Sequence, residues 1–290
     1  MAAEKRVKKL RCIQRSADRH WVGDGFPVRT LFAYPNLGPV LSPFLLLDYA
    51  GPREFAPTSE RLGVGEHPHR GFETVTIVYA GEVEHRDSSG GGGRIGPGDV
   101  QWMTAASGLV HEEFHGRAFA RTGGLFEMVQ LWVNLPAKDK LTKPRYQDIQ
   151  ADGIPEVELG PGARARVLVG TVNGVKGPVM EVATDPLYFD LHLEPNASYT
   201  ATLPEGHNAF AYVYDGDAKI GGAGTGVQRS ELAMLTQGES LPVTAGAQGA
   251  RLIVVAGRPL EEPVARYGPF VMNTADEIRQ AFADYQAGRL

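Results

Sequence analysis

Short apolar segments separated by turn-forming residues recur along the whole chain, and this pattern restricts the fold more than any other feature. Val75–Tyr79 is followed by Gly81, and Met128–Val133 is a further segment of this kind. Segments of four to eight apolar residues bounded by glycine or proline are typical of β-strands in sequential hairpins. The 36 glycines and 20 prolines among 290 residues exceed the average usage of about 7% and about 5%. We therefore expect an all-β protein.

The length and one polar stretch indicate the domain organisation. A chain of 290 residues corresponds to roughly two domains at about 150 residues each. Residues 135–144 are polar, contain two prolines and lack periodicity, as a connector does. The strand pattern returns at Ala165–Val169, Leu187–Leu193 and Arg251–Ala256. We expect an N-terminal domain of residues 1–136 and a C-terminal domain of residues 137–290.

Two further segments have local signals of their own. Thr274–Glu277 has the sequence of a capping box, and Ile278, Ala281, Phe282 and Tyr285 then lie on one helical face. This predicts a short helix that closes the chain and packs on the sheets. Residues 90–93 are all glycine, but no Lys-Ser or Lys-Thr follows them. They therefore predict a hairpin tip and not a phosphate-binding loop.

Composition excludes several classes of protein. Lysine and arginine number 29 against 34 acidic residues, so the chain has no basic surplus for nucleic acid. The single cysteine, Cys12, forms neither an internal disulfide nor a thiolate metal cage, and we expect a cytoplasmic protein. The basic stretch Met1–Arg11 lacks the apolar region of a secretory signal, and Pro43–Leu47 is too short to span a bilayer. Neither export nor membrane insertion is expected.

Two pairs of polar residues with the same spacing carry the predicted chemistry. His67 and His69 are two residues apart, as are His111 and Glu113. Side chains two apart on a strand project from one face, so each pair can contribute two ligands to one ion. Two such strands facing each other in a barrel would form a site of three histidines and one glutamate. Imidazole and carboxylate suit Fe, Mn, Co, Ni, Cu or Zn, and four protein ligands leave positions open on an octahedral ion.

Neighbouring residues offer alternatives to this ligand set. Glu73 lies four residues after His69 and shares its face if the strand is regular, whereas Glu112 should point away from the site. His115 lies four residues after His111 and projects from the same face of the strand. We expect it at the strand end or next to a ligand, where it would support the ligand without binding the metal. His85 and Asp87 either orient a ligand or make hydrogen bonds in a turn.

Five segments together resemble the pirin family of the cupin superfamily. They are Pro43–Asp48, His67–Glu73, Glu84–Ser88, Ser107–Glu113 and Tyr267–Thr274. The resemblance implies a bicupin, with two stacked antiparallel β-barrel (jelly-roll) domains. It also implies one metal, usually iron, in the N-terminal domain only, held by His67, His69, His111 and Glu113. The later Glu113 then takes the place that Glu73 has in general cupins.

The resemblance implies two functions. The first is a quercetin 2,3-dioxygenase that opens the flavonol ring with O2 and releases carbon monoxide, with Fe(II) as the expected metal. Glu113 would then be both ligand and catalytic base. The second is an iron-dependent, redox-sensing regulator that binds a protein partner without turnover.

A planar substrate needs an apolar, aromatic pocket. Phe44, Phe72, Trp102 and Phe126 are candidates for its walls, each with ordinary core packing as the alternative. His192 and His207 in the second half are isolated histidines, so we expect no metal there.

Overall fold

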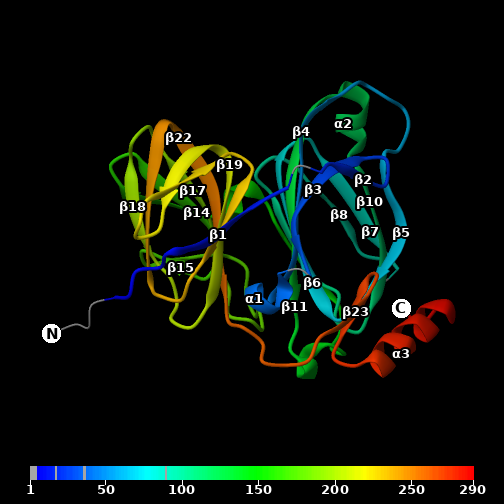
Figure 1. Cartoon of the computed structure of the whole chain (residues 1–290). Coiled ribbons are helices and arrows are strands. Elements are labelled where there is room, and N and C mark those ends of the chain that lie inside the picture. The colour runs from blue at the N-terminus through cyan, green and yellow to red at the C-terminus, as the bar shows by residue number, and fades with distance from the viewer. Residues whose placement is uncertain (1–4, 17, 35–36, 89) are drawn as a thin grey trace. The chain divides into compact units, whose positions relative to one another are not determined.

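The computed structural model describes residues 5–16, 18–34, 37–88 and 90–290, which divide into two compact units (Figure 1). Of the described residues, the first unit contains 18–34, 44–88, 90–151 and 260–290. The second unit contains 5–16, 37–43 and 152–259. Strands dominate both units and pair antiparallel within their sheets. The all-β prediction is confirmed.

The first unit has two main sheets that enclose an apolar cluster. One sheet has seven strands in the order β12 (Arg145–Ile149), β9 (Val100–Thr104), β6 (Phe72–Ala80), β11 (Gly124–Asn134), β4 (Phe44–Phe55), β3 (Phe26–Ala33) and β2 (His20–Val22). The other has four strands in the order β5 (Gly63–His69), β10 (Leu109–His115), β7 (Val83–Asp87) and β8 (Gly92–Ile95). Val78 and Phe126 from the larger sheet pack with Val83 and Ile95 from the smaller one. The two sheets therefore face each other, and their inner faces bound the interior.

The remaining elements of the first unit are short. They are α2 (Arg117–Thr122), the 3₁₀ turn Ala137–Asp139, the hairpin β23 (Ala265–Tyr267) and β24 (Phe270–Met272), and α3 (Ala275–Gln286). The hairpin of β7 and β8 confirms the predicted role of the glycine run. No helix in the described ranges is long and apolar enough to cross a bilayer.

The second unit consists mainly of one nine-stranded sheet. Its main path is β1 (Leu10–Arg15), β21 (Glu231–Leu235), β19 (Asn208–Ile220), β22 (Ser240–Gly257), β17 (Leu187–Leu193), β14 (Ala163–Val169) and β13 (Glu156–Gly160). Beside this path, β18 (Ser198–Thr202) pairs with β22 and β20 (Thr225–Gln228) pairs with β19. Smaller elements are α1 (Gly38–Leu41), β15 (Thr171–Val172), β16 (Val175–Lys176) and all but the first residue of the 3₁₀ turn Ala151–Gly153.

Alternation along the strands builds the core of the second unit. On β17, Leu187, Phe189, Leu191 and Leu193 all belong to one buried apolar cluster. These residues are two apart, so one face of the strand carries all of them. The predicted strand Leu187–Leu193 matches β17 at both ends.

The units do not follow a single division at 136/137, because each end of the chain belongs to the unit that is built mainly from the other half of the sequence. The first strand β1 pairs with β21 in the second unit. The last helix α3 begins at the predicted capping box, since Thr274 accepts a hydrogen bond from the Glu277 amide. It belongs to the first unit, where Ile278 and Ala281 pack against Phe270 of β24. The prediction of the helix is confirmed, but its expected membership of a domain 137–290 differs from the structure.

An ion pair attaches α3 to the end of β5. Arg70, which follows β5 directly, places Nη1 2.8 Å from Oδ2 of Asp284. The Arg70 Nε also donates to the carbonyl of Ser107 at 2.6 Å. Both side chains of the pair are largely buried, and the hydrogen bond from Arg70 keeps the pKa of Asp284 well below its usual range. The helix is therefore held next to the strand that carries His67 and His69.

The expected connector contains a buried lysine. Lys140 donates to the carbonyl of Gly71 at 2.6 Å, to Oδ1 of Asn134 at 2.6 Å and to the carbonyl of Val271 at 3.0 Å. Burial lowers the pKa of Lys140 to about 7. Residues 137–151 thus form part of the first unit and not a free linker, because this ammonium joins three of its segments.

This lysine predicts a specific pH dependence of stability. Between about pH 7 and pH 10 the unfolded lysine binds a proton that the folded one has lost, so the free energy of unfolding should rise with pH by up to about 1.4 kcal/mol per unit. We expect Lys140→Met to remove this contribution, whereas the exposed Lys138→Met keeps it. Urea unfolding at pH 7, 8 and 9 measures the difference. If the free energy of unfolding had the same pH dependence in the wild type, Lys140→Met and Lys138→Met, Lys140 would not be the source of this effect.

Candidate metal centre

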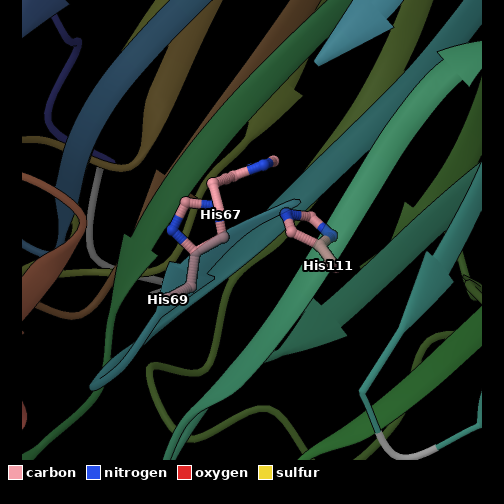
Figure 2. Close-up of side chains that lie close together, drawn as sticks. All are labelled: His67, His69 and His111. Atoms are coloured by element: carbon pink, nitrogen blue, oxygen red, sulfur yellow. The ribbon is translucent and has the colours of Figure 1, made fainter. Parts of the chain in front are cut away.

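Two neighbouring strands of the four-stranded sheet bring three of the predicted ligands together. His111 on β10 lies opposite His67 on β5, and His69 lies opposite Leu109. Because side chains two apart share a face, His67, His69 and His111 all project into the same side of the sheet. One ring nitrogen of each histidine lies within 4.8 Å of the others (Figure 2). The structure thus forms the histidine cluster that the sequence predicts.

Three buried ring nitrogens of this cluster have no hydrogen-bond partner in the described part of the chain. Nδ1 of His69 and both nitrogens of His111 are buried and bond to nothing among the described residues. His67 differs, because its Nδ1 lies 2.9 Å from the carbonyl of Gly65. That contact places the proton of a neutral His67 on Nδ1 and leaves Nε2 as its free lone pair. Buried polar atoms are normally paired, so the converging unpaired nitrogens fit a metal ion.

Electrostatics keep two of the three rings neutral. Burial lowers the pKa of His69 to about 3, with a smaller effect of His67 in the same direction, while a hydrogen bond with the backbone of Pro269 opposes it. Burial also holds the pKa of His111 well below its usual range, followed by the charges of His69 and His67. Neutral imidazole is the form that binds a metal. The donor chemistry of the cluster therefore suits a transition ion.

Glu113 lies beside the histidine cluster but is farther from it than the rings are from one another. Its Oε2 lies 4.0 Å from Nε2 of His111. Its Oε1 accepts a long hydrogen bond, 3.4 Å, from Nε2 of Gln130 on the facing sheet. The pairing of β10 with β5 shifts between His111 and Glu113, so that Glu113 lies opposite Val64. The carboxylate is on the predicted face and is oriented by the amide of Gln130, which was not a predicted site residue.

The other two glutamates lie elsewhere. Glu73 is on β6 of the seven-stranded sheet, and its Oε1 accepts a hydrogen bond of 2.7 Å from Thr104. Burial raises the pKa of Glu73 to about 7, against the effect of that hydrogen bond. Glu112 accepts from Arg86 at 2.8 Å and from Arg61 at 3.4 Å, away from the interior. Neither glutamate belongs to the cluster.

His115 occupies the apolar end of the same interior face. Its ring stacks on Phe126 with centroids 4.7 Å apart and meets Phe55 edge-on at 4.6 Å. One nitrogen, Nε2, lies 2.8 Å from the carbonyl of Gly25, the geometry of a donated hydrogen bond. Because its ring is enclosed by aromatic side chains, His115 is a packed strand-end residue in this structure.

His85 and Asp87 line the interior on the other side of β10. His85 lies opposite Glu113, and Asp87 lies opposite His111. The His85 ring stacks on Tyr146 with centroids 5.2 Å apart, and its Nε2 is 3.5 Å from Oδ2 of Asp148. Burial raises the pKa of Tyr146, and the charge of Asp87 adds to this shift. These groups form a second polar cluster next to the histidines.

A row of polar residues crosses the inner face of the seven-stranded sheet and was not predicted. Its members are register partners on successive strands: Thr30, Asp48, Gln130, Thr76, Gln101 and Asp148. Gln130 donates to Thr76 at 3.2 Å, and Gln101 donates to Asp148 at 3.2 Å. The row lies opposite the strands that carry the histidines. The sequence signal for it is weak, namely single polar residues within otherwise apolar strands.

The aromatic candidates have different positions. Phe72 lies 5.1 Å from His69 between centroids, and Phe126 packs around His115. Trp102 is buried on β9, and Phe44 is fully buried at the start of β4. Trp132 was not among these candidates, but its ring is 5.3 Å from His69 and 4.3 Å from Phe72. Phe72 and Trp132 thus form the aromatic wall nearest to the cluster.

The histidines of the second unit have other partners. His192 Nε2 is 3.1 Å from the hydroxyl of Tyr214, which donates to Asp190 at 2.7 Å. His207 Nε2 lies 3.8 Å from a carboxylate oxygen of Asp185. Within the described ranges, the histidines of β5 and β10 are the group of three or more donor residues that can share one ion.

Two family models match the chain. The model described as Pirin matches residues 25–133, and the model described as Pirin C-terminal cupin domain matches residues 188–290. Together they span both units, including the histidine strands and α3. These matches agree with the five segments that resemble pirins in the sequence.

Relatives of the chain match it over nearly its whole length. A Pseudomonas aeruginosa protein named "Putative quercetin 2,3-dioxygenase" is 50% identical over 285 residues, covering 98% of each chain. Human pirin is 37% identical and covers 91% of this chain and 88% of its own. A crystal structure of quercetin 2,3-dioxygenase from Acinetobacter baumannii superposes with a TM-score of 0.94 at 47% identity, covering 98% of each chain. The chain belongs to the pirin family and has its two cupin domains.

Proposed function

We propose that this protein is a metal-dependent dioxygenase that opens the central ring of quercetin-type flavonols with O2. The observation that carries the proposal is the convergence of His67, His69 and His111, where Nδ1 of His69 and both ring nitrogens of His111 are buried without a hydrogen-bond partner among the described residues. The names of the Pseudomonas and Acinetobacter relatives support the same reaction.

We assign the metal to His67, His69, His111 and Glu113, with Fe(II) as the expected ion. Three imidazoles and one carboxylate suit Fe(II), and also Mn, Ni, Co, Cu or Zn. The bound ion would supply a Lewis acid that lowers the pKa of a coordinated flavonol hydroxyl. Oε2 of Glu113 lies 4.0 Å from Nε2 of His111. In this assignment the Glu113 side chain moves closer and joins the three rings as a ligand.

The chain's own residues have separate roles in this proposal. Glu113 takes the proton of the flavonol hydroxyl at a carboxylate oxygen, because it lies beside His111 and faces the interior. Gln130 orients that carboxylate through its hydrogen bond to Oε1. Phe72 and Trp132 present apolar surface beside His69, which favours a planar ligand and excludes water.

One preparation tests the metal and the reaction. The protein is purified without added metal, its metals are quantified by plasma mass spectrometry, and the loss of quercetin and release of carbon monoxide are followed under air. We expect about one transition ion per chain and turnover that stops when the ion is removed by a chelator. Stoichiometric metal without turnover of any flavonol would favour the iron-dependent regulator, and absence of metal would overturn the ligand assignment.

A further inference from the structure

Arg266 lies next to the aromatic wall of the metal centre. It belongs to β23, and its Cζ is 5.2 Å from the centroid of the Trp132 ring. The same tryptophan meets His69 edge-on at 5.3 Å. One aromatic ring therefore separates this guanidinium from a metal-binding imidazole.

The donors of Arg266 are unused in the described part of the chain. The side chain is half-buried, yet it makes no hydrogen bond and no ion pair with any described residue. Burial lowers the pKa of Arg266, and the charge of Asp48 opposes that shift. The Asp48 carboxylate is not within ion-pair distance of the guanidinium. The Asp48 carboxylate instead accepts from Thr30 at 2.5 Å. A half-buried cation that has no hydrogen-bonded or ion-paired partner among the described residues can bind an anionic ligand, which offsets part of its desolvation cost.

Stacking on Trp132 leaves the in-plane N–H groups of the Arg266 guanidinium available for hydrogen bonds. A guanidinium that contacts a ring through its face keeps its N–H groups in its own plane, where they match an oxyanion or a carboxylate in bidentate fashion. Thr30, Asp48 and Gln130 continue the polar surface along the neighbouring strands. A planar molecule bound at the histidines and lying along Trp132 would direct its far edge toward Arg266.

We propose that Arg266 determines substrate specificity by binding an anionic oxygen on the edge of a planar aromatic substrate remote from its metal-binding oxygens. The inference rests on the proposed function and defines its substrate class more closely, as flavonol-like molecules with a second acidic oxygen. Arg266 is a recognition residue, and it takes no part in the ring-opening step.

The test measures binding without turnover. Metal-loaded protein is titrated under argon with 3-hydroxyflavone and with its 4′-carboxylate derivative, and the flavonol absorbance shift gives each Kd. Both ligands have the same metal-binding edge and differ in the remote anion. We expect Arg266→Gln to weaken the carboxylate about tenfold or more and 3-hydroxyflavone less than about twofold, as expected for loss of one charged hydrogen-bonding pair.

Two variants separate recognition from packing. Arg53→Gln is the matched control, because Arg53 also covers a tryptophan, Trp21, at 4.9 Å. It should leave both affinities unchanged. Arg266→Lys should bind the carboxylate more tightly than Arg266→Gln and less tightly than the wild type. Lysine has the positive charge but not the two parallel N–H donors of the guanidinium.

The outcomes distinguish this inference from the proposed function. Equal weakening of both ligands by Arg266→Gln, or no weakening, would overturn the recognition role. Failure of both flavonols to bind the loaded wild type would overturn the substrate class. If Arg266-dependent binding is found but no flavonol is opened under air, the inference stands and the proposed reaction is wrong.

Discussion

Replacing His69 by alanine is expected to remove the bound metal and flavonol turnover together. His69 is buried beside His67 and His111, and its free Nδ1 has no hydrogen-bond partner among the described residues. Loss of one imidazole leaves two rings that bind the ion far more weakly. Mutation of residues that only hydrogen-bond to metal ligands already lowers metal affinity by about 10–100-fold. We therefore expect the metal content of His69→Ala after dialysis to fall by more than about tenfold.

A histidine on the same interior face provides the control. His115 is buried like His69, but its ring is enclosed by Phe55 and Phe126. We expect His115→Phe to fill that space and to retain the metal and the activity. Circular dichroism verifies that both variants fold. Normal metal content in His69→Ala, or loss of metal in His115→Phe, would show that the ligands are assigned to the wrong histidines.

Replacing Glu113 by glutamine is expected to lower kcat by about 100-fold or more, the usual contribution of a positioned general base. The amide keeps the shape of the side chain and the neighbouring Gln130 but cannot accept the proton of the flavonol hydroxyl. We expect metal binding to weaken as well, because a neutral amide is a poorer ligand than a carboxylate. Stopped-flow turnover at saturating metal separates the two effects.

Glu73 is the matched control for that variant. It is a buried glutamate near the histidines in sequence, but its carboxylate bonds to Thr104 on β9. We expect Glu73→Gln to retain the metal content and the kcat of the wild type. Full turnover in Glu113→Gln at saturating metal would exclude Glu113 as the base. Loss of metal in Glu73→Gln alone would show that Glu73 is the glutamate ligand, as in general cupins.

In the candidate metal centre, the local pattern of the strands agrees with the structure. Alternation along a strand is a local property, so the sequence alone placed His67 with His69 and His111 with Glu113. The capping box at Thr274 and the hairpin at the glycine run are local as well, and both are confirmed. The short apolar segments predicted the strands because each one must bury its side chains within a few residues of a turn.

The position of Glu73 depended on the tertiary structure. The chain turns at Gly71, whose φ is +88° and whose added Cβ would lie 1.9 Å from the carbonyl of Val271. That turn moves the chain from β5 to β6 in the other sheet. The expectation that Glu73 shares the face of His69 required one regular strand, and the turn ends that strand at His69.

Other features came from contacts between residues far apart in the chain. The helix α3 lies in the first unit because its apolar face packs on β24 and Asp284 pairs with Arg70. Lys140 is buried because it meets carbonyls of Gly71 and Val271, which no local pattern reveals.

The sequence by itself determined the strands, the last helix and the two pairs of candidate ligands, because each depends on residues within a few positions of one another. The tertiary structure decided which pairs meet and which carboxylate faces them. It also placed Trp132 and Gln130 beside them and Arg266 against Trp132. These depend on strand register and sheet order, which are fixed by packing across the whole unit.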